Sequence, residues 1–359
     1  MSTADLTLVV GASGIAGQAT VRHLVDQGRP VIGLSRGNNP LPPGVSGVQA
    51  DLMDPESLRT ALAEVRPTGV VFTAWMRQDT EAENIAVNSA TVRNLLAALS
   101  DAGSVRHVSL MTGLKHYMGP FEAYGTGLVA ETPFRESEPR LPGPNFYYAQ
   151  EDEVFAAAAR DGFSWSVHRS HTVFGYATGN AMNMALTLGA YAAICRQTGA
   201  PFVFPGSAMQ WNGLTDVTDA DLLAEQMVWA LDAEPAQNEA FNIANGDVFR
   251  WRWMWPRIAE LLGVEAEGFQ DQPRPLDPRL TGLDAQVWPT IAREHHLVQG
   301  DIGRLASWWH TDADLGRDLE CLTDMTKSRQ AGFLGFRDSF ESFRGAIEAY
   351  RAAGVLPRV

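Results

Sequence analysis

The chain has 359 residues, 45% of them apolar, which is enough for one large domain with a second region attached. It carries 42 acidic and 28 basic residues, and the net charge of −14 argues against nucleic acid and anionic membranes as partners. Cys195 and Cys321 stand in apolar sequence and predict buried free thiols; no basic, apolar leader precedes the first expected strand, so we expect a cytoplasmic protein.

The first half of the sequence alternates short apolar runs with longer helical segments. The predicted strands cover residues 6–10, 30–34, a third strand that ends before Asp51, and then 69–73, 107–111 and 165–169. The predicted helices cover 15–27, 81–100 and segments beginning at Pro55 and near Tyr147. Asp54 precedes Pro55 as the expected N-cap of its helix. Repeated strand–helix units predict an α/β fold with a doubly wound parallel sheet of the Rossmann type.

The second half is less regular and predicts a smaller, mainly helical region. A Pro-rich loop extends over 133–144, an apolar helix is expected at 182–197, and a strand is expected at 240–243. Asn245 and Gly246 then indicate a turn. From Arg250 onward the sequence is rich in tryptophan and is expected to be mostly helical.

Gly11, Gly14 and Gly17 form a G-x-x-G-x-x-G pattern after the first strand and at the start of the first helix. Glycines allow the tight turn and let a pyrophosphate approach backbone N–H groups at the helix N-terminus. The pattern therefore predicts a dinucleotide site, which should include Ser13 and Ile15. The expected division is a dinucleotide-binding domain of residues 1–172 and 206–248, and a substrate-binding or lid region of residues 173–205 and 249–359.

The end of the second strand indicates which dinucleotide binds. NAD enzymes commonly place Asp or Glu there to bind the ribose hydroxyls, whereas this sequence has Ser35 and Arg36. Because an arginine can pair bidentately with a 2′-phosphate, the sequence favours NADP(H). Asp51 and Leu52, after the third strand, are expected beside the adenine, although Asp51 could instead cap a turn.

Lys115 stands out because it and Lys327 are the only lysines among the 28 basic residues. It follows the fifth strand, at the sheet edge where such folds bind ligands. Short-chain dehydrogenases pair a catalytic tyrosine with a lysine four residues on, but none of the seven tyrosines here has one; Tyr147 has Glu151 at that position. Either the chain is not a catalyst or another lysine substitutes, and Lys115 is the obvious substitute.

Several longer stretches carry a resemblance to a known family. They are Gly-Ala-Ser-Gly-Ile-Ala-Gly at 11–17, Thr-Glu-Ala-Glu-Asn at 80–84, Thr-Gly-Leu-Lys-His-Tyr-Met-Gly-Pro-Phe-Glu at 112–122, Asn-Phe-Tyr-Tyr-Ala-Gln-Glu-Asp at 145–152 and Phe-Asn-Ile-Ala-Asn-Gly-Asp-Val-Phe at 241–249. With shorter stretches between and beyond them, they cover nearly the whole chain. On these residues the sequence resembles the progesterone 5β-reductase/iridoid synthase-like enzymes, an atypical branch of the extended short-chain dehydrogenases.

The resemblance implies NADPH as cofactor and 1,4-reduction of α,β-unsaturated carbonyl compounds, with Lys115 and Tyr147 as the catalytic pair. Further cofactor contacts are expected at Thr73, Ala74, Thr112, His171 and Val173. One departure lies at residues 170–172, Ser-His-Thr, where the family often has Pro-Gly-Asn. This segment should border the nicotinamide, so cofactor geometry or substrate range could differ.

The expected substrate is a small apolar enone in an apolar pocket. The candidate pocket walls, each of which could instead be ordinary core packing, are Trp75, Phe121, Tyr124, Met182 and Phe336. No spacing of His, Cys and carboxylates indicates a metal site. A homodimer is common for this scaffold, and the sequence leaves it open.

Three other functions compete with enone reduction. A sugar-nucleotide epimerase would normally have the Tyr-x-x-x-Lys pair and NAD, and the sequence favours neither. A ketone or aldehyde reductase is harder to separate, because the same tyrosine could polarise an isolated carbonyl group. A non-catalytic NADP(H) sensor would keep the glycine pattern without the catalytic tyrosine, and the presence of both Lys115 and Tyr147 argues against it.

Overall fold

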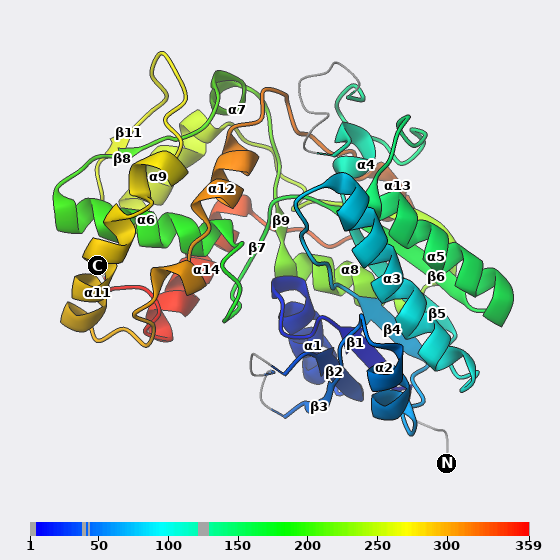
Figure 1. Cartoon of the computed structure of the whole chain (residues 1–359). Coiled ribbons are helices and arrows are strands. Elements are labelled where there is room, and N and C mark those ends of the chain that lie inside the picture. The colour runs from blue at the N-terminus through cyan, green and yellow to red at the C-terminus, as the bar shows by residue number, and fades with distance from the viewer. Residues whose placement is uncertain (1–4, 38–40, 42–43, 121–128, 359) are drawn as a thin grey trace. The chain divides into compact units, whose positions relative to one another are not determined.

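The computed structural model describes residues 5–37, 41, 44–120 and 129–358 (Figure 1). The chain divides into two compact units, each formed from several segments. The first unit contains residues 1–171, 221–243 and 324–335, and the second unit contains residues 172–220, 244–323 and 336–359.

The first unit is built on a seven-stranded, all-parallel sheet with the strand order β10-β6-β5-β4-β1-β2-β3. Its strands are β1 Thr7–Val10, β2 Val31–Ser35, β3 Ser46–Gln49, β4 Gly69–Phe72, β5 His107–Gly113, β6 Ser164–Ser170 and β10 Glu239–Ile243. Every residue of β1 and β4 is buried, as expected for central parallel strands covered on both faces. The chain order reverses between β1 and β4, which is where such sheets bind ligands.

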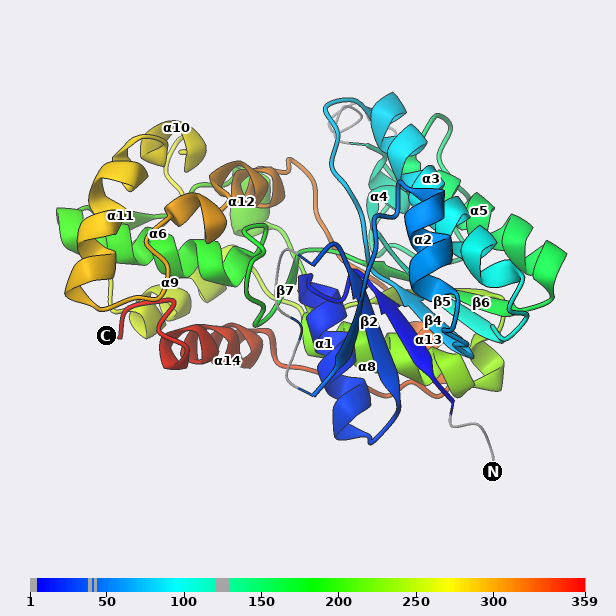
Figure 2. The ribbon, with the colours of Figure 1, turned by 60° about the horizontal axis from the view of Figure 1, so that its bottom comes forward.

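Helices cover both faces of this sheet, as Figure 2 shows, with α2, α3 and α5 on one face and α1 and α8 on the other. The helices are α1 Ile15–Asp26, α2 Pro55–Leu62, α3 Glu81–Ser100, α4 Lys115–Met118, α5 Phe146–Asp161, α8 Ala220–Asp232 and α13 Thr326–Gln330, with a 3₁₀ turn at Glu234–Ala236. Asp54 caps α2 as predicted, and its carboxylate accepts from the N–H groups of Glu56 and Ser57.

The predicted Rossmann-type fold is confirmed, with two local differences near the sheet edge. Strand β5 extends two residues beyond the predicted end, because its pairing with β6 continues through Gly113 and Ser170. Lys115 therefore begins a short helix, α4, that the sequence did not predict, only two residues after the strand.

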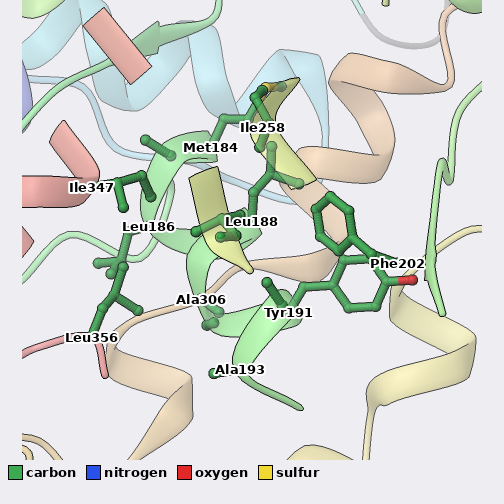
Figure 3. Packing of buried hydrophobic residues seen from close by; sticks show 14 of the residues in the cluster. Met184, Leu186, Leu188, Tyr191, Ala193, Phe202, Ile258, Ala306, Ile347 and Leu356 are labelled. Atoms are coloured by element: carbon green, nitrogen blue, oxygen red, sulfur yellow. The ribbon is translucent and has the colours of Figure 1, made fainter. Parts of the chain in front are cut away.

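The second unit has a core around α6 (Figure 3). Its elements are β7 Val173–Phe174, α6 Met184–Thr198, β8 Phe202–Val203, α7 Ala208–Asn212, β9 Thr218–Asp219, α9 Trp251–Leu262, β11 Ala266–Glu267, α10 Asp277–Leu280, α11 Leu283–Glu294, a 3₁₀ turn at Ile302–Arg304, α12 Trp308–Leu315 and α14 Ser339–Ala352. Helix α6 is buried along its length from Met184 to Cys195, and Phe202 stacks on Trp255 with ring centroids 4.2 Å apart. Trp251, Trp255 and Trp288 of the tryptophan-rich sequence thus serve as core packing, whereas Trp253 is exposed.

The observed division differs from the expected one in two places. Of the segment 206–248, only residues 221–243 lie in the first unit. Residues 324–335 return to the first unit, where Phe333 packs on Trp229 with ring centroids 5.6 Å apart and α13 lies against β10.

The structure also gives the state of the two cysteines. Cys195 and Cys321 are both buried and both free, as predicted. Within the described ranges, no helix combines the length and the apolar composition that crossing a bilayer requires.

Candidate active site

The glycine loop, residues 11–17, connects β1 to α1. Gly11 has a φ of 80°, which only glycine adopts without strain, and a Cβ added to Gly17 would overlap the carbonyl oxygen of Gly11. Gly14 is the N-cap of α1 and offers no side chain to the first turn, which also contains no acidic residue. The N-terminus of α1 is therefore a positive helix end open to an anion.

The end of β4 packs closely against this loop. A Cβ on Gly11 would lie 3.0 Å from the Ala74 nitrogen and 3.0 Å from the Thr73 hydroxyl oxygen. The Thr73 hydroxyl donates to the carbonyl of Val10 at 2.8 Å. This backbone cradle, closed to side chains, fits the approach of a pyrophosphate between β1 and β4.

Arg36, the residue predicted to select the cofactor, lies just after β2 with an exposed side chain. Its backbone is held by Gln49, whose amide donates to the Arg36 carbonyl at 3.0 Å, and the Ser35 hydroxyl accepts from Gly37 at 3.3 Å. The guanidinium is thus placed on a fixed strand end without being buried.

Asp51 and Leu52 follow β3, at the next strand end. The Asp51 carboxylate accepts from the N–H of Met53 at 2.9 Å, so it serves as a turn cap, the alternative that the sequence left open. Leu52 packs partly against the sheet core, and its carbonyl accepts from Asn94 at 2.9 Å. Both residues keep local structural roles whatever they bind.

Lys115 and Tyr147 come from neighbouring elements, the start of α4 and the first turn of α5. A Cβ on Gly113 would lie 3.0 Å from the Tyr147 hydroxyl oxygen, so that hydroxyl lies against the carboxyl end of β5. The Lys115 ammonium lies 5.0 Å from the ring centroid of Phe146. Both side chains are half-buried.

Asn145 fixes the two helices to each other. Its side-chain amide donates to the Lys115 carbonyl at 2.9 Å, while its oxygen caps α5 by accepting from the N–H of Tyr147 at 3.0 Å. The carboxylate of Glu81 on α3 accepts from the N–H of Phe146, the first residue of α5, at 2.6 Å. Two polar side chains therefore set the start of α5.

Burial raises the pKa of Tyr147, and the nearby Glu81 carboxylate raises it further. The phenol thus stays neutral and can donate a hydrogen bond at ordinary pH. The neighbouring His116 is also neutral, because burial and then the charge of Arg169 lower its pKa to about 3.

Trp75 lies beside this pair. Its ring stacks on Phe146 with centroids 5.9 Å apart and an interplanar angle of 18°, and Phe146 contacts the Tyr147 ring at 4.1 Å. The loop after β4, which carries Trp75, is held by Asn88 of α3. The Asn88 side chain accepts from the N–H of Met76 at 2.8 Å and donates to the Met76 carbonyl at 2.9 Å. An apolar surface therefore borders the tyrosine.

The other predicted contacts are placed less closely. Thr112 is buried in β5, where its carbonyl accepts from the Ser170 hydroxyl at 3.2 Å, and His171 is buried just after β6. Val173 lies in β7 of the second unit, Met182 just before α6, and Phe336 in the second unit with 54% of its surface exposed. Phe121 and Tyr124 lie outside the described residues. These assignments stay predictions.

Sequence reasoning missed the residues that hold the candidate pair in place, namely Gly113, Asn145 and Glu81. Asn145 could have been found, because an asparagine before a helical run is a common N-cap. No spacing pointed to Glu81, whose partner is 65 residues away in the sequence.

Residues 45–357 match the PRISE-like Rossmann-fold domain family. Two curated relatives are each 37% identical over 98% of this chain and 93% of their own length: 3-oxo-Delta(4,5)-steroid 5-beta-reductase of Arabidopsis thaliana and (S)-8-oxocitronellyl enol synthase CYC2 of Camptotheca acuminata. The solved UDP-glucose 4-epimerase of Thermus thermophilus covers 97% of this chain and 99% of its own, with a TM-score of 0.69 at 19% identity, which confirms the fold. The resemblance inferred from the sequence is confirmed, and the chain belongs to the PRISE-like Rossmann-fold family.

Proposed function

We propose that this oxidoreductase uses NADPH to reduce the C=C bond of α,β-unsaturated carbonyl compounds by 1,4-addition. The observation that carries the proposal is the position of the Tyr147 hydroxyl, which lies against Gly113 at the carboxyl end of β5. Lys115 lies two residues after Gly113. The names of the relatives, a steroid 5-beta-reductase and an enol synthase, support the same chemistry.

The residues of the first unit fit a nicotinamide dinucleotide. The glycine loop would bind the pyrophosphate with its backbone N–H groups. Thr73, Ala74 and Thr112, at the ends of β4 and β5, would contact the cofactor between the pyrophosphate and the reacting groups. Arg36 and Ser35 would bind the 2′-phosphate, which favours NADPH over NADH. When bound, this cofactor supplies the hydride.

Tyr147 would act on the carbonyl oxygen of the substrate. As the C=C bond is reduced, negative charge develops on that oxygen, and the neutral phenol donates a hydrogen bond to it. Loss of one such donor typically lowers kcat about 10²–10³-fold. Lys115 would add positive potential beside the developing enolate.

The surroundings of Tyr147 favour an apolar substrate. Trp75 and Phe146 form a stacked aromatic pair next to it, and neither ring carries a formal charge. Phe146 is buried and supports Trp75, so the partly exposed Trp75 ring would pack against a hydrocarbon ring or chain, while the Tyr147 hydroxyl would orient the carbonyl group.

The test is NADPH oxidation, followed at 340 nm, with a small cyclic enone and with progesterone, for the wild type and Tyr147→Phe. We expect wild-type turnover of at least one enone, a fall in kcat of about 10²–10³-fold in the variant, and unchanged NADPH binding by fluorescence titration. Tyr148→Phe is the matched comparison, because the Tyr148 hydroxyl donates to the carbonyl of His116 and is not available to a substrate. Because that bond joins α5 to α4, its loss should lower the stability and reduce kcat by no more than about tenfold, far less than the loss in Tyr147→Phe.

The corresponding saturated ketone separates the competing functions. Faster turnover of the ketone than of the enone would make the chain a carbonyl reductase. Tight NADPH binding with no turnover of the enone or the ketone would favour a non-catalytic NADP(H) sensor. Turnover of the enone that survives in Tyr147→Phe would remove the tyrosine from the mechanism.

A further inference from the structure

Glu151 occupies the position four residues after Tyr147 on α5, where short-chain dehydrogenases usually have the catalytic lysine. Its side chain is only 3% exposed. A buried carboxylate is costly unless it is paired, so its surroundings should explain its presence.

Two arginines from different elements pair with this carboxylate. Arg140, in the loop before α5, donates to one Glu151 oxygen at 2.8 Å and to Asp152 at 2.8 Å. Arg169 of β6, itself buried, lies 3.8 Å from the other oxygen. We name these three side chains the Arg140–Glu151–Arg169 cluster. Glu151 is thus a counter-ion for the buried Arg169 and shares the neutralisation of Arg140 with Asp152.

Arg169 connects the cluster to α4, the helix that begins with Lys115. Its guanidinium donates to the Tyr117 hydroxyl at 3.1 Å, and that hydroxyl donates to Asn242 of β10 at 2.7 Å. Both Tyr117 and Asn242 are fully buried. The Tyr117 ring is therefore held at one end by the cluster, two residues after Lys115.

Arg140 supports a second connection between the same two helices. Its guanidinium lies 4.8 Å from the ring centroid of Tyr148 on α5. The Tyr148 hydroxyl donates to the His116 carbonyl of α4 at 2.6 Å and accepts from the N–H of Leu141 at 2.9 Å. Each arginine thus touches a tyrosine that joins α4 to its surroundings.

We propose that Glu151 is a positioning residue that, through Arg140 and Arg169, holds α4 against α5 and so sets where Lys115 lies relative to Tyr147. The inference rests on the proposed function of that pair. The Glu151 carboxylate thus stands at the position of the usual lysine but has a different role. It anchors the helix that brings a substitute lysine from another part of the chain.

Removing the Glu151 charge should loosen α4 specifically. The buried Arg169 guanidinium would then lose the carboxylate beside it, while Arg140, which is partly exposed, would keep Asp152 as its partner, and Arg169 would shift away from its present position. Because Arg169 donates to Tyr117, a shift of Arg169 moves the helix that carries Lys115. A misplacement of about 1 Å at a catalytic group can cost about 10²-fold in rate, so a partial shift should cost about tenfold.

The test compares Glu151→Gln with Glu153→Gln in the full-length protein. Glu153 lies on the same helix but is more exposed and pairs with Arg93 of α3. Hydrogen exchange without cofactor should be at least about tenfold faster, in Glu151→Gln only, at the amides of Met118 and Gly119, which donate to the carbonyls of Leu114 and Lys115 at the start of α4. With an enone, kcat should fall about tenfold while the KM for NADPH stays within about twofold.

A double-mutant cycle asks whether Glu151 acts through Lys115. Glu151→Gln should lower kcat in the wild type but have little further effect in Lys115→Met. If Glu151→Gln fails to fold, Tyr117→Phe breaks the same connection without leaving a charge unpaired, and it should give the same exchange pattern with a smaller fall in kcat.

Unchanged exchange at α4 in both variants would overturn the positioning role, whatever the activity. Equal falls in kcat with and without Lys115 would overturn it too. Failure of the proposed function would look different. The wild type would then turn over no enone, and the hydrogen-exchange comparison would still decide whether Glu151 anchors α4.

Discussion

The glycine loop and the Lys115–Tyr147 pair both lie at the carboxyl ends of strands of one sheet, yet they are built in different ways. The loop is made of backbone and of missing side chains, since a Cβ on Gly17 would overlap Gly11. The pair is held by side chains from distant segments, such as Asn145 and Glu81. A site of the first kind tolerates no added atom, whereas one of the second kind can shift gradually.

The largest effect is expected at Gly17. Gly17→Ala places a methyl group on the carbonyl of Gly11, which cannot move without displacing β1 or α1. NADPH affinity should fall at least about 100-fold, roughly 2.7 kcal/mol, as measured by fluorescence titration. Gly14→Ala should cost less, because its Cβ would lie 3.3 Å from the Gly11 oxygen and its φ of −82° suits any residue. Equal losses in the two variants would contradict a backbone-built site.

A smaller effect is expected at Arg36, the charged side chain that we assign to cofactor choice. Hydrogen bonds to charged groups contribute about 1.5–3 kcal/mol, so Arg36→Ala should weaken NADPH binding about 10–100-fold and leave NADH binding nearly unchanged. Arg59→Ala is the control, since Arg59 is exposed on α2 and pairs with Glu56. If NADPH and NADH lose affinity equally, Arg36 does not read the 2′-phosphate.

These two sites also explain how far the sequence alone could reach. The loop, its flanking strand and helix, and the cap at Asp54 are local patterns, and all were predicted. Lys115 was singled out by its rarity, but the contacts that place α4 were not predicted. The bond from Tyr117 to Asn242 joins residues 125 positions apart, and no periodicity in one chain reveals such a partner.

The second unit teaches the same lesson at a larger scale. Its buried helix was predicted from a mostly apolar run that is interrupted by Asn183, and the observed helix starts only two residues later than expected, at Met184. The return of residues 324–335 to the first unit was not predicted, because it depends on Phe333 packing against Trp229. Composition indicates that such residues are buried, but it does not indicate against what.

The mildest and most diagnostic effect is expected at Gly113, where the backbone of β5 meets the Tyr147 side chain. A methyl group there would lie 3.0 Å from both the Tyr147 hydroxyl oxygen and the Ser170 carbonyl, so the tyrosine must move by a few tenths of an ångström. Gly113→Ala should therefore lower kcat for an enone about three- to tenfold while leaving NADPH affinity unchanged. Steady-state kinetics with the same enone would measure this split.

Gly345→Ala is the matched control, because Gly345 lies within α14 and an added Cβ there meets nothing within 4 Å. That change should stabilise the protein by up to about 1 kcal/mol and leave kcat as it was. If Gly113→Ala instead weakens NADPH binding and spares kcat, the carboxyl end of β5 positions the cofactor and not the tyrosine. The carboxyl end of β5 would then act on the cofactor through its backbone, as the glycine loop does, and the proposed difference between the two sites would not hold at Gly113.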